Sequence, residues 1–146
     1  MTRVDFYVLP DNSRQERFAC MMTHKVWSKG KPLFINTASQ EMAEAFDNLL
    51  WTYHDISFIP HELINTNEIT ESPVIIGWQG KLPKQTEVLL NLAHDMPTNA
   101  ERFARIIEIV AGDGSPRQQA RDKYREYRKR GYDLHNHSIE SDYGHT

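Results

Sequence analysis

Short β-rich apolar segments alternate with amphipathic helical segments along the first half of the chain, and this alternation constrains the fold more than any other feature. Strands are predicted at residues 4–9, 32–36 and 56–59, the last ended by Pro60. A helix is predicted in each of the two intervals. Strand–helix–strand units are joined by right-handed crossovers, so the strands are expected to be parallel neighbours in one sheet.

Both predicted helices carry local start signals. The first begins with the capping-box pattern Ser13–Glu16 and ends at Gly30, while the second begins with the box Thr37–Gln40 and extends to about Trp51. Their apolar stripes are Phe18, Met22 and Val26 in the first helix, and Met42, Ala45, Phe46 and Leu49 in the second.

The second half of the chain continues the same plan. Further strands are predicted at 73–78, 87–92 and 105–110, although 105–110 is also compatible with a helix. A short helix is expected after the cap at 98–101. The final helix has the best start signal, Ser-Pro-Arg-Gln at 115–118, and ends at Gly131. The sequence thus predicts a single-domain, three-layer α/β fold with a mostly parallel central sheet flanked by helices, Rossmann-like in outline.

Nucleotide-binding and catalytic motifs are not found. The first strand–helix turn, 9–14, contains no glycine, so the glycine-rich dinucleotide fingerprint is missing. Gly77–Lys81 is two residues too short for a phosphate-binding P-loop and has no Ser or Thr after the lysine. We therefore predict no nucleotide-binding loop, no cofactor and no catalytic group.

Metal and thiol chemistry are also not predicted. His135 and His137, with Asp133 and His145 nearby, could gather a metal, but a solvated tail is the favoured interpretation of this polar segment. Cys20 lies near the apolar face of the first helix and is expected in the core. A single cysteine excludes an internal disulfide and fits a reducing, cytoplasmic compartment. No stretch approaches the ~20 apolar residues of a membrane-spanning helix.

The final helix concentrates positive charge. Residues 117–131 hold seven Lys or Arg against two acids, a local charge of +5, whereas the whole chain carries −3, so the remainder carries −8. Arg117, Arg121, Tyr124, Arg125 and Arg128 fall on one side of a helix, and Ala120, Tyr124, Tyr127 and Gly131 mark an adjoining stripe that can dock on the sheet. This basic ridge either binds an anionic partner, a peptide or a nucleic acid, or is a solvated helical face.

A second candidate surface is aromatic. Trp51 ends the second helix, and Phe58, Ile59 and Pro60 close the third predicted strand, so these residues can meet at one rim of the sheet. A protein-binding patch and ordinary core are both possible, and core is favoured by the usual burial of such residues.

Several motifs together resemble the chi subunits of bacterial DNA polymerase III holoenzyme. They are Phe6-Tyr-Val-Leu9, then Leu50-Trp51 followed by Ser57-Phe-Ile-Pro-His61, then Tyr124-Arg-Glu-Tyr127-Arg128-Lys-Arg-Gly131-Tyr-Asp-Leu134. The resemblance extends from about residue 3 to 134. It implies a chi-like α/β domain over 1–134 and a polar tail over 135–146; neither 64–72 nor this tail aligns clearly with the family.

The resemblance further implies a non-catalytic accessory subunit of the clamp-loader complex. Such proteins bind the psi subunit on one face and, on another, the acidic tail of single-stranded DNA-binding protein, which ends in Asp-Phe-Pro-Phe. Nucleic acid is then contacted only indirectly, and an iron–sulfur helicase can take the place of psi. By position, the tail site is Val110, Arg117, Arg121, Tyr124 and Arg125, with Arg128 on the same ridge, and the psi site is Trp51, Phe58, Ile59 and Pro60.

Overall fold

Within the part of the chain that the structure describes, seven strands form one parallel sheet. A computed structural model describes residues 2–10, 15–53, 59–64, 72–78, 87–97, 99–111 and 115–139. Neighbouring strands lie in the order β3-β4-β2-β5-β6-β1-β7, and every pairing is parallel. The strands are β1 (Arg3–Val8), β2 (Leu33–Thr37), β3 (His61–Leu63), β4 (Val74–Trp78), β5 (Val88–Asn91), β6 (Arg105–Val110) and β7 (Asp133–Ser138).

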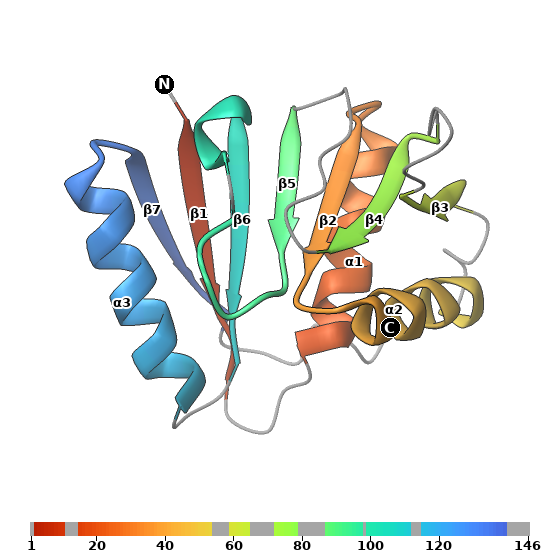
Figure 1. Ribbon diagram of the computed structural model, residues 1–146, viewed down its shortest axis with the longest axis horizontal. Helices are drawn as coiled ribbons and strands as arrows, with labels where there is room; N and C mark the ends of the chain where they lie inside the picture. Colours follow the sequence, from red (N-terminus) through yellow and green to blue (C-terminus); the bar gives the residue numbers. More distant parts are fainter. Residues whose placement is uncertain are drawn as a thin grey trace.

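Helices cover both faces of this sheet. Helices α1 (Gln15–Ser28) and α2 (Gln40–Thr52) pack on one face, and α3 (Ser115–Lys129) packs on the other, beside β1, β6 and β7 (Figure 1). A single turn of 3-10 helix, η2 (Ala100–Arg102), precedes β6. The predicted single-domain α/β fold with a parallel sheet is confirmed.

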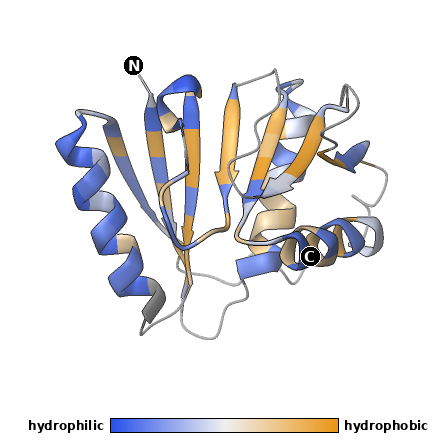
Figure 2. Ribbon diagram, in the orientation of Figure 1, coloured by the Kyte–Doolittle hydropathy of each residue, from blue (hydrophilic) through white to orange (hydrophobic). Residues whose placement is uncertain are grey.

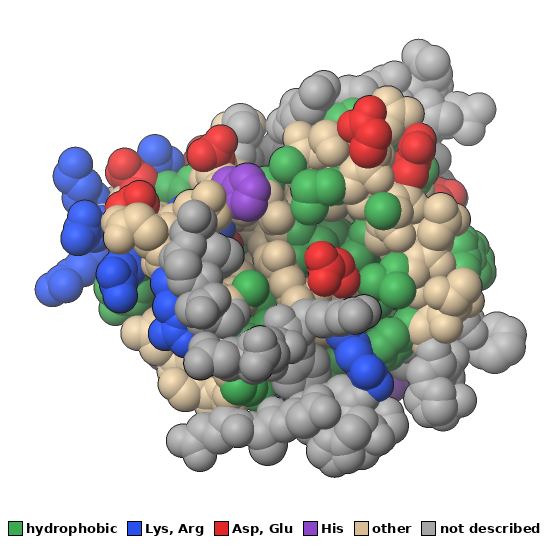
Figure 3. Space-filling model, turned by 90° about the horizontal axis from the view of Figure 1, so that it is seen from below, with side chains coloured by type: hydrophobic (Ala, Val, Ile, Leu, Met, Phe, Trp, Pro, Cys, Tyr) green, Lys and Arg blue, Asp and Glu red, His purple; other side chains and the backbone are tan. Residues whose placement is uncertain are grey.

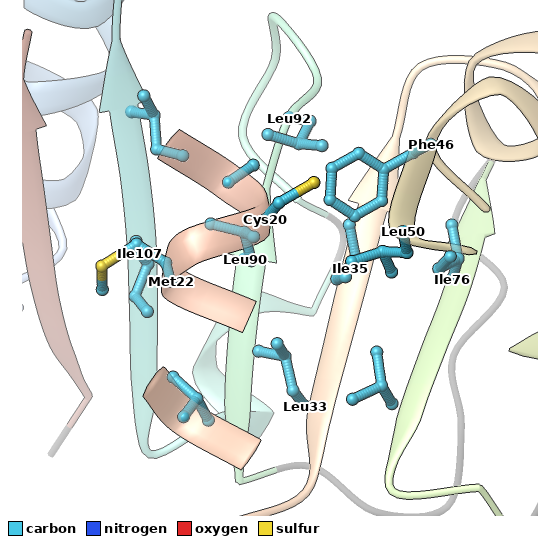
Figure 4. Packing of buried hydrophobic residues seen from close by; sticks show 14 of the residues in the cluster. Cys20, Met22, Leu33, Ile35, Phe46, Leu50, Ile76, Leu90, Leu92 and Ile107 are labelled. Atoms are coloured by element: carbon cyan, nitrogen blue, oxygen red, sulfur yellow. The ribbon is translucent and has the colours of Figure 1, made fainter. Parts of the chain in front are cut away.

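The strands alternate their side chains between two hydrophobic clusters. Ile35, Leu90 and Ile107 point toward α1 and α2, whereas their neighbours Phe34, Leu89 and Ile106 point toward the α3 side. Because both faces are covered, the central strands are apolar almost throughout, while α3 is largely hydrophilic (Figure 2). Figure 4 shows the first cluster, with side chains from α1 and α2 directed onto the sheet.

Two glycines end their helices as predicted. Gly30 and Gly131 have φ angles of 75° and 80°, the left-handed region in which glycine is not strained. After α3, the Gly131 amide donates to the Arg128 carbonyl and the Tyr132 amide donates to the Tyr127 carbonyl, the two bonds of a Schellman motif. The Tyr127 and Tyr132 rings lie 5.6 Å apart, which supplies the apolar contact of that motif.

The predicted start of α2 is wrong by two residues, and its buried stripe is rotated. Ser39 is the N-cap, and its hydroxyl accepts a hydrogen bond from the Met42 amide at 3.2 Å. Thr37 belongs to β2 instead, with its hydroxyl 2.9 Å from the Gly77 carbonyl oxygen. Within α2, the buried residues are Ala43, Phe46 and Leu50, whereas Met42 and Ala45 are exposed.

Three further predictions differ from the structure. Residues 56–58 of the proposed strand at 56–59 lie outside the described residues, Ile59 does not belong to a strand, and the nearby strand is β3, which begins after Pro60. Thr98 also lies outside them, and η2 follows Asn99, which adopts a φ of 57°. The tail expected from residue 135 is wrong for residues 135–138, because β7 pairs with β1 along its whole length. The strand predicted at 105–110, by contrast, is confirmed as β6.

Within the described part of the chain, no helix is long and apolar enough to cross a membrane.

Candidate binding groove beside helix α3

A groove lies between α3 and the ends of β1, β6 and β7. It encloses about 170 Å³ and opens to solvent. The residues that line it come from four separate elements: Phe6, Val8, Val110, Arg117, Ala120, Arg121, Tyr124 and Asn136. We call this the α3 groove.

The α3 groove has an apolar floor and one cationic wall. Phe6, Val8 and Val110 form the floor, and the Phe6 ring lies 5.4 Å from the ring of Tyr124. Arg117 and Arg121 stand one turn apart on the α3 wall, as expected for i and i+4 positions. Figure 3 shows Lys and Arg side chains gathered on the α3 side of the molecule. An apolar surface beside guanidinium groups can hold an apolar anchor next to a carboxylate.

A buried carboxylate fixes α3 on the sheet. Glu108 of β6 is 1% exposed, and its Oε1 accepts a hydrogen bond from the Lys123 Nζ at 2.6 Å. Its Oε2 accepts from the Tyr127 hydroxyl at 2.7 Å. Burial and the neighbouring Glu108 charge raise the pKa of Tyr127 far above its usual value, so Tyr127 remains a neutral donor. Lys123 and Tyr127 are i and i+4 residues of α3, so one carboxylate holds a full turn of that helix.

The same carboxylate continues a polar row across the sheet. Asn91 of β5 donates to Glu108 Oε2 at 2.9 Å, and Asn36 of β2 donates to Asn91 Oδ1 at 2.9 Å. No buried side-chain nitrogen or oxygen in the described part of the chain lacks a partner. A fully satisfied buried network of this kind gives a single orientation of the helix rather than a sliding contact.

The groove gathers four of the six residues predicted for the tail site. Val110, Arg117, Arg121 and Tyr124 line it. The predicted docking stripe of α3 is confirmed for Tyr127, which is fully buried, and for the partly buried Ala120 and Tyr124, but not for Gly131, which is exposed. Arg125 and Arg128 do not line the groove, because the helical twist directs them further outward.

These two arginines lie on the exposed surface of α3. Arg125 Nη1 is 3.9 Å from Asp122 Oδ1, and the Arg125 side chain is 75% exposed. Arg128 is also exposed. They add positive potential near the groove without forming part of its wall.

Phe6, Val8 and Asn136 also line the groove but were absent from the sequence-based set. Side chains alternate along a strand, so Phe6 and Val8 of β1 share the face that packs toward α3, and this alternation could have suggested them once the position of α3 was known. Asn136 has no such signal, because the polar sequence from residue 135 onward shows no apolar alternation that would indicate a strand.

The second predicted surface is partly exposed. Trp51 is 52% exposed, so the core interpretation is wrong for this residue, and Pro60 is exposed as well. Ile59, however, is 1% exposed and belongs to the core, so its side chain cannot be contacted from solution. Phe58 lies outside the described residues.

A buried histidine supports Trp51 from beneath. The His61 and Trp51 ring centroids are 4.2 Å apart. His61 Nδ1 lies 2.6 Å from the Ile59 carbonyl oxygen, and Nε2 lies 3.4 Å from Asp47 Oδ1. His61 therefore joins α2 to β3 and holds the tryptophan at the surface.

An ionic cluster attaches β7 to the sheet. Asp5 of β1 is fully buried and accepts hydrogen bonds from Arg3 and Arg105, while His137 Nε2 lies 2.8 Å from its Oδ1. The His137 ring also stacks on Tyr7, with centroids 4.5 Å apart. Burial by itself raises the pKa of Asp5, but the hydrogen bonds from Arg3, His137 and Arg105 outweigh burial and lower it to about 2.

Metal and thiol sites are not supported by the described side chains. Among them, no group of three His, Cys, Asp or Glu residues could hold a metal ion. His135 pairs with Asp133 at 3.0 Å and His137 with Asp5, so the two histidines have separate carboxylate partners. Cys20 is confirmed in the core, where burial, with Glu16 nearby, raises the pKa of its thiol to about 12.

A second hollow, of about 160 Å³, lies at the opposite ends of the strands, beside the end of α1. Its cations include Lys25, Lys29 and Lys31, all exposed, and Lys31 lies 3.6 Å from Glu87. Lysines at a helix C-terminus are explained by the helix dipole, so this hollow carries no separate functional signal.

Comparison with known proteins gives one consistent result. The sequence model of a family described as "DNA polymerase III chi subunit, HolC" matches residues 1–135. A protein named DNA polymerase III subunit chi from Pseudomonas aeruginosa is 36% identical over 141 residues, covering 95% of this chain and 98% of its own. Proteins of the same name from Haemophilus influenzae and Escherichia coli are 31% and 28% identical, covering 92% of this chain and 95% and 96% of their own.

Proposed function

The chain belongs to the family of DNA polymerase III chi subunits, and from that premise we propose that it is a non-catalytic accessory subunit that links two partners. One partner is the psi subunit of the clamp-loader complex, and the other is the acidic C-terminal tail of single-stranded DNA-binding protein. The observation that carries this proposal is the α3 groove, in which an apolar floor lies directly beside two arginines.

The chemistry of the groove suits a peptide that ends in Asp-Phe-Pro-Phe. A phenylalanine ring can cover Val110 and the adjacent floor and contact Tyr124, which removes apolar surface from water. Arg117 and Arg121 can pair with the aspartate and the terminal carboxylate. Arg125 and Arg128 contribute at longer range, where salt screens them more strongly.

The two proposed partner surfaces lie on opposite edges of the sheet. Trp51 and Pro60 are beside β3, at one edge, while the α3 groove is beside β7, at the other (Figure 1). Both partners can therefore bind at the same time, as an adaptor requires. The psi surface would use Trp51, Phe58 and Pro60 together with Ile59, which the core holds in a buried position, and an iron–sulfur helicase would take the same surface in place of psi.

This assignment places the protein in the cytoplasm, with nucleic acid contacted only through single-stranded DNA-binding protein. The alternative is a direct nucleic-acid-binding module. It is favoured by the exposed Arg125, Arg128 and Lys129, which extend the positive surface beyond the groove. A nucleic-acid site would engage many phosphates and show a steep dependence of affinity on salt, whereas a peptide site with two or three ion pairs would not.

Fluorescence anisotropy of a labelled peptide ending in Asp-Phe-Pro-Phe tests the proposal. We expect saturable binding in the micromolar range, about −8 kcal/mol, and a large loss when the last phenylalanine is removed. Arg121→Ala should weaken binding several-fold, and higher salt should weaken but not abolish it. An Arg121→Ala protein that binds as tightly as the wild type would refute the proposed site, and tight binding of single-stranded DNA with a steep salt slope would favour the alternative.

A further inference from the structure

Strand β7 contributes one residue, Asn136, to the lining of the α3 groove. The parallel register places Asn136 beside Phe6 of β1, and the Asn136 side chain lines the groove. Its neighbours along the strand have other roles, because His137 binds Asp5 and His135 binds Asp133. Asn136 is therefore the one β7 residue among those that line the groove.

The Asn136 carboxamide has unused hydrogen-bonding capacity. Its side chain is exposed, and no hydrogen bond within the described ranges joins it to another residue. An asparagine side chain offers two N–H donors and one carbonyl acceptor. At the edge of an apolar floor, these groups are available to a ligand.

The charged residues that line the groove all belong to α3. Arg117 and Arg121 both belong to α3, and Asn136 is neutral. Carboxylates of a bound acidic peptide are thus drawn to α3, while Asn136 offers the rest of the peptide a group that can both donate and accept a hydrogen bond. A neutral carboxamide matches a peptide unit, which has one donor and one acceptor of its own.

We propose that Asn136 is a specificity-determining residue of the α3 groove, which hydrogen-bonds the main chain of the peptide while the arginines bind its carboxylates. The inference rests on the proposed function, since it takes the ligand to be an acidic peptide with an apolar end. It adds a contact from outside the basic helix.

The test compares Asn136→Ala and Asn136→Asp with the wild type in the anisotropy assay, using the peptide ending in Asp-Phe-Pro-Phe. Loss of one neutral hydrogen bond should make Asn136→Ala bind about 3- to 10-fold more weakly. That factor should stay constant as salt is raised, because no charge is lost. Asn136→Asp should bind more weakly still, and salt should recover part of its loss by screening the repulsion between carboxylates.

Ser138→Ala is the matched control, because Ser138 is an exposed residue of the same strand that does not line the groove. It should bind as the wild type does. Thermal melting of all three variants should match the wild type, since Asn136 has no partner in the described part of the fold.

A peptide with an amidated C-terminus separates a main-chain contact from a contact with the terminal carboxylate. We expect amidation to weaken binding by the wild type and by every variant. The ratio of the Asn136→Ala and wild-type dissociation constants should stay the same. The inference is overturned if Asn136→Ala binds the free-acid peptide as tightly as the wild type, or if its deficit disappears with the amidated peptide. Failure of the wild type itself to bind would instead remove the proposed function and this inference with it.

Discussion

Replacement of Lys123 by methionine should destabilise the fold far more than its position on a polar helix suggests. The Lys123 side chain is 12% exposed, and its ammonium group lies 2.6 Å from Glu108 Oε1. Methionine retains most of the aliphatic length but removes the charge. The variant leaves the Glu108 carboxylate, 1% exposed, with the Tyr127 and Asn91 donors alone.

The expected magnitude follows from the burial of the pair. Removal of one partner from a buried ion pair costs about 3–5 kcal/mol, because the remaining charge is uncompensated. Glu108 keeps two hydrogen bonds and Lys123 lies at the edge of the core, so we expect a loss of unfolding free energy at the lower end of this range, about 3 kcal/mol. For a domain of this size, that corresponds to a melting temperature roughly 10 °C lower.

The assay is urea unfolding at pH 7, with Lys129→Met as the control. Lys129 is on the same helix but is exposed, and no ion pair joins it to another described residue. Lys129→Met should therefore change the free energy of unfolding by less than about 0.5 kcal/mol. The double variant Glu108→Gln/Lys123→Met should lose less unfolding free energy than the sum of the losses of the two single variants, because the two side chains interact directly.

Equal stability of Lys123→Met and Lys129→Met would refute this reasoning. It would mean that the Glu108–Lys123 contact contributes nothing to the attachment of α3, and that apolar packing of Tyr127 and Tyr124 alone holds the helix.

Three other perturbations test separate parts of the structure. The pKa of Asp5 is lowered from 3.8 to about 2, so its ionised form stabilises the fold fully above pH 3.8, and roughly 2 kcal/mol of that stability is lost as pH falls to about 2. The difference in unfolding free energy between the wild type and Asp5→Asn should therefore shrink by that amount from pH 7 to pH 2. A difference that does not depend on pH would contradict the lowered pKa. Gly131→Ala should cost about 1 kcal/mol through its positive φ alone, since a Cβ there would meet no atom within 4 Å, and chemical denaturation that showed no loss would exclude the strain. Trp51→Ala should abolish binding of the proposed psi partner in a pull-down, while the affinity for the tail peptide should stay within twofold of the wild type. Loss of both binding activities together would contradict the proposal that the two surfaces are independent.

Local signals were enough for most of the secondary structure. The alternation of apolar strands with amphipathic helices predicted the parallel sheet, because both patterns are periodic over a few residues and need no knowledge of distant contacts. The end of α3 at Gly131 follows from one residue type with access to positive φ. The spacing of Arg117, Arg121 and Tyr124 likewise placed them on one side of a helix before their surroundings were known.

Local signals failed where burial depends on a distant partner. The stripe of α2 was rotated, because Leu49 and Leu50 are equally apolar and only contact with the sheet decides that Leu50 is the buried one. Strand β7 has no apolar alternation, and it is held by pairing with β1 and by the contact of His137 with Asp5, 132 residues earlier in the chain.

The sequence by itself determined the fold class, the family and the basic ridge, because these depend on residue type and short-range spacing. The tertiary structure decided which ridge residues share a groove, and it added Asn136 of β7 to the residues that line this groove. It also revealed that Glu108 binds Lys123 and Tyr127, residues 15 and 19 positions away. Such contacts join elements that meet only when the sheet is assembled, so no pattern along the chain records them.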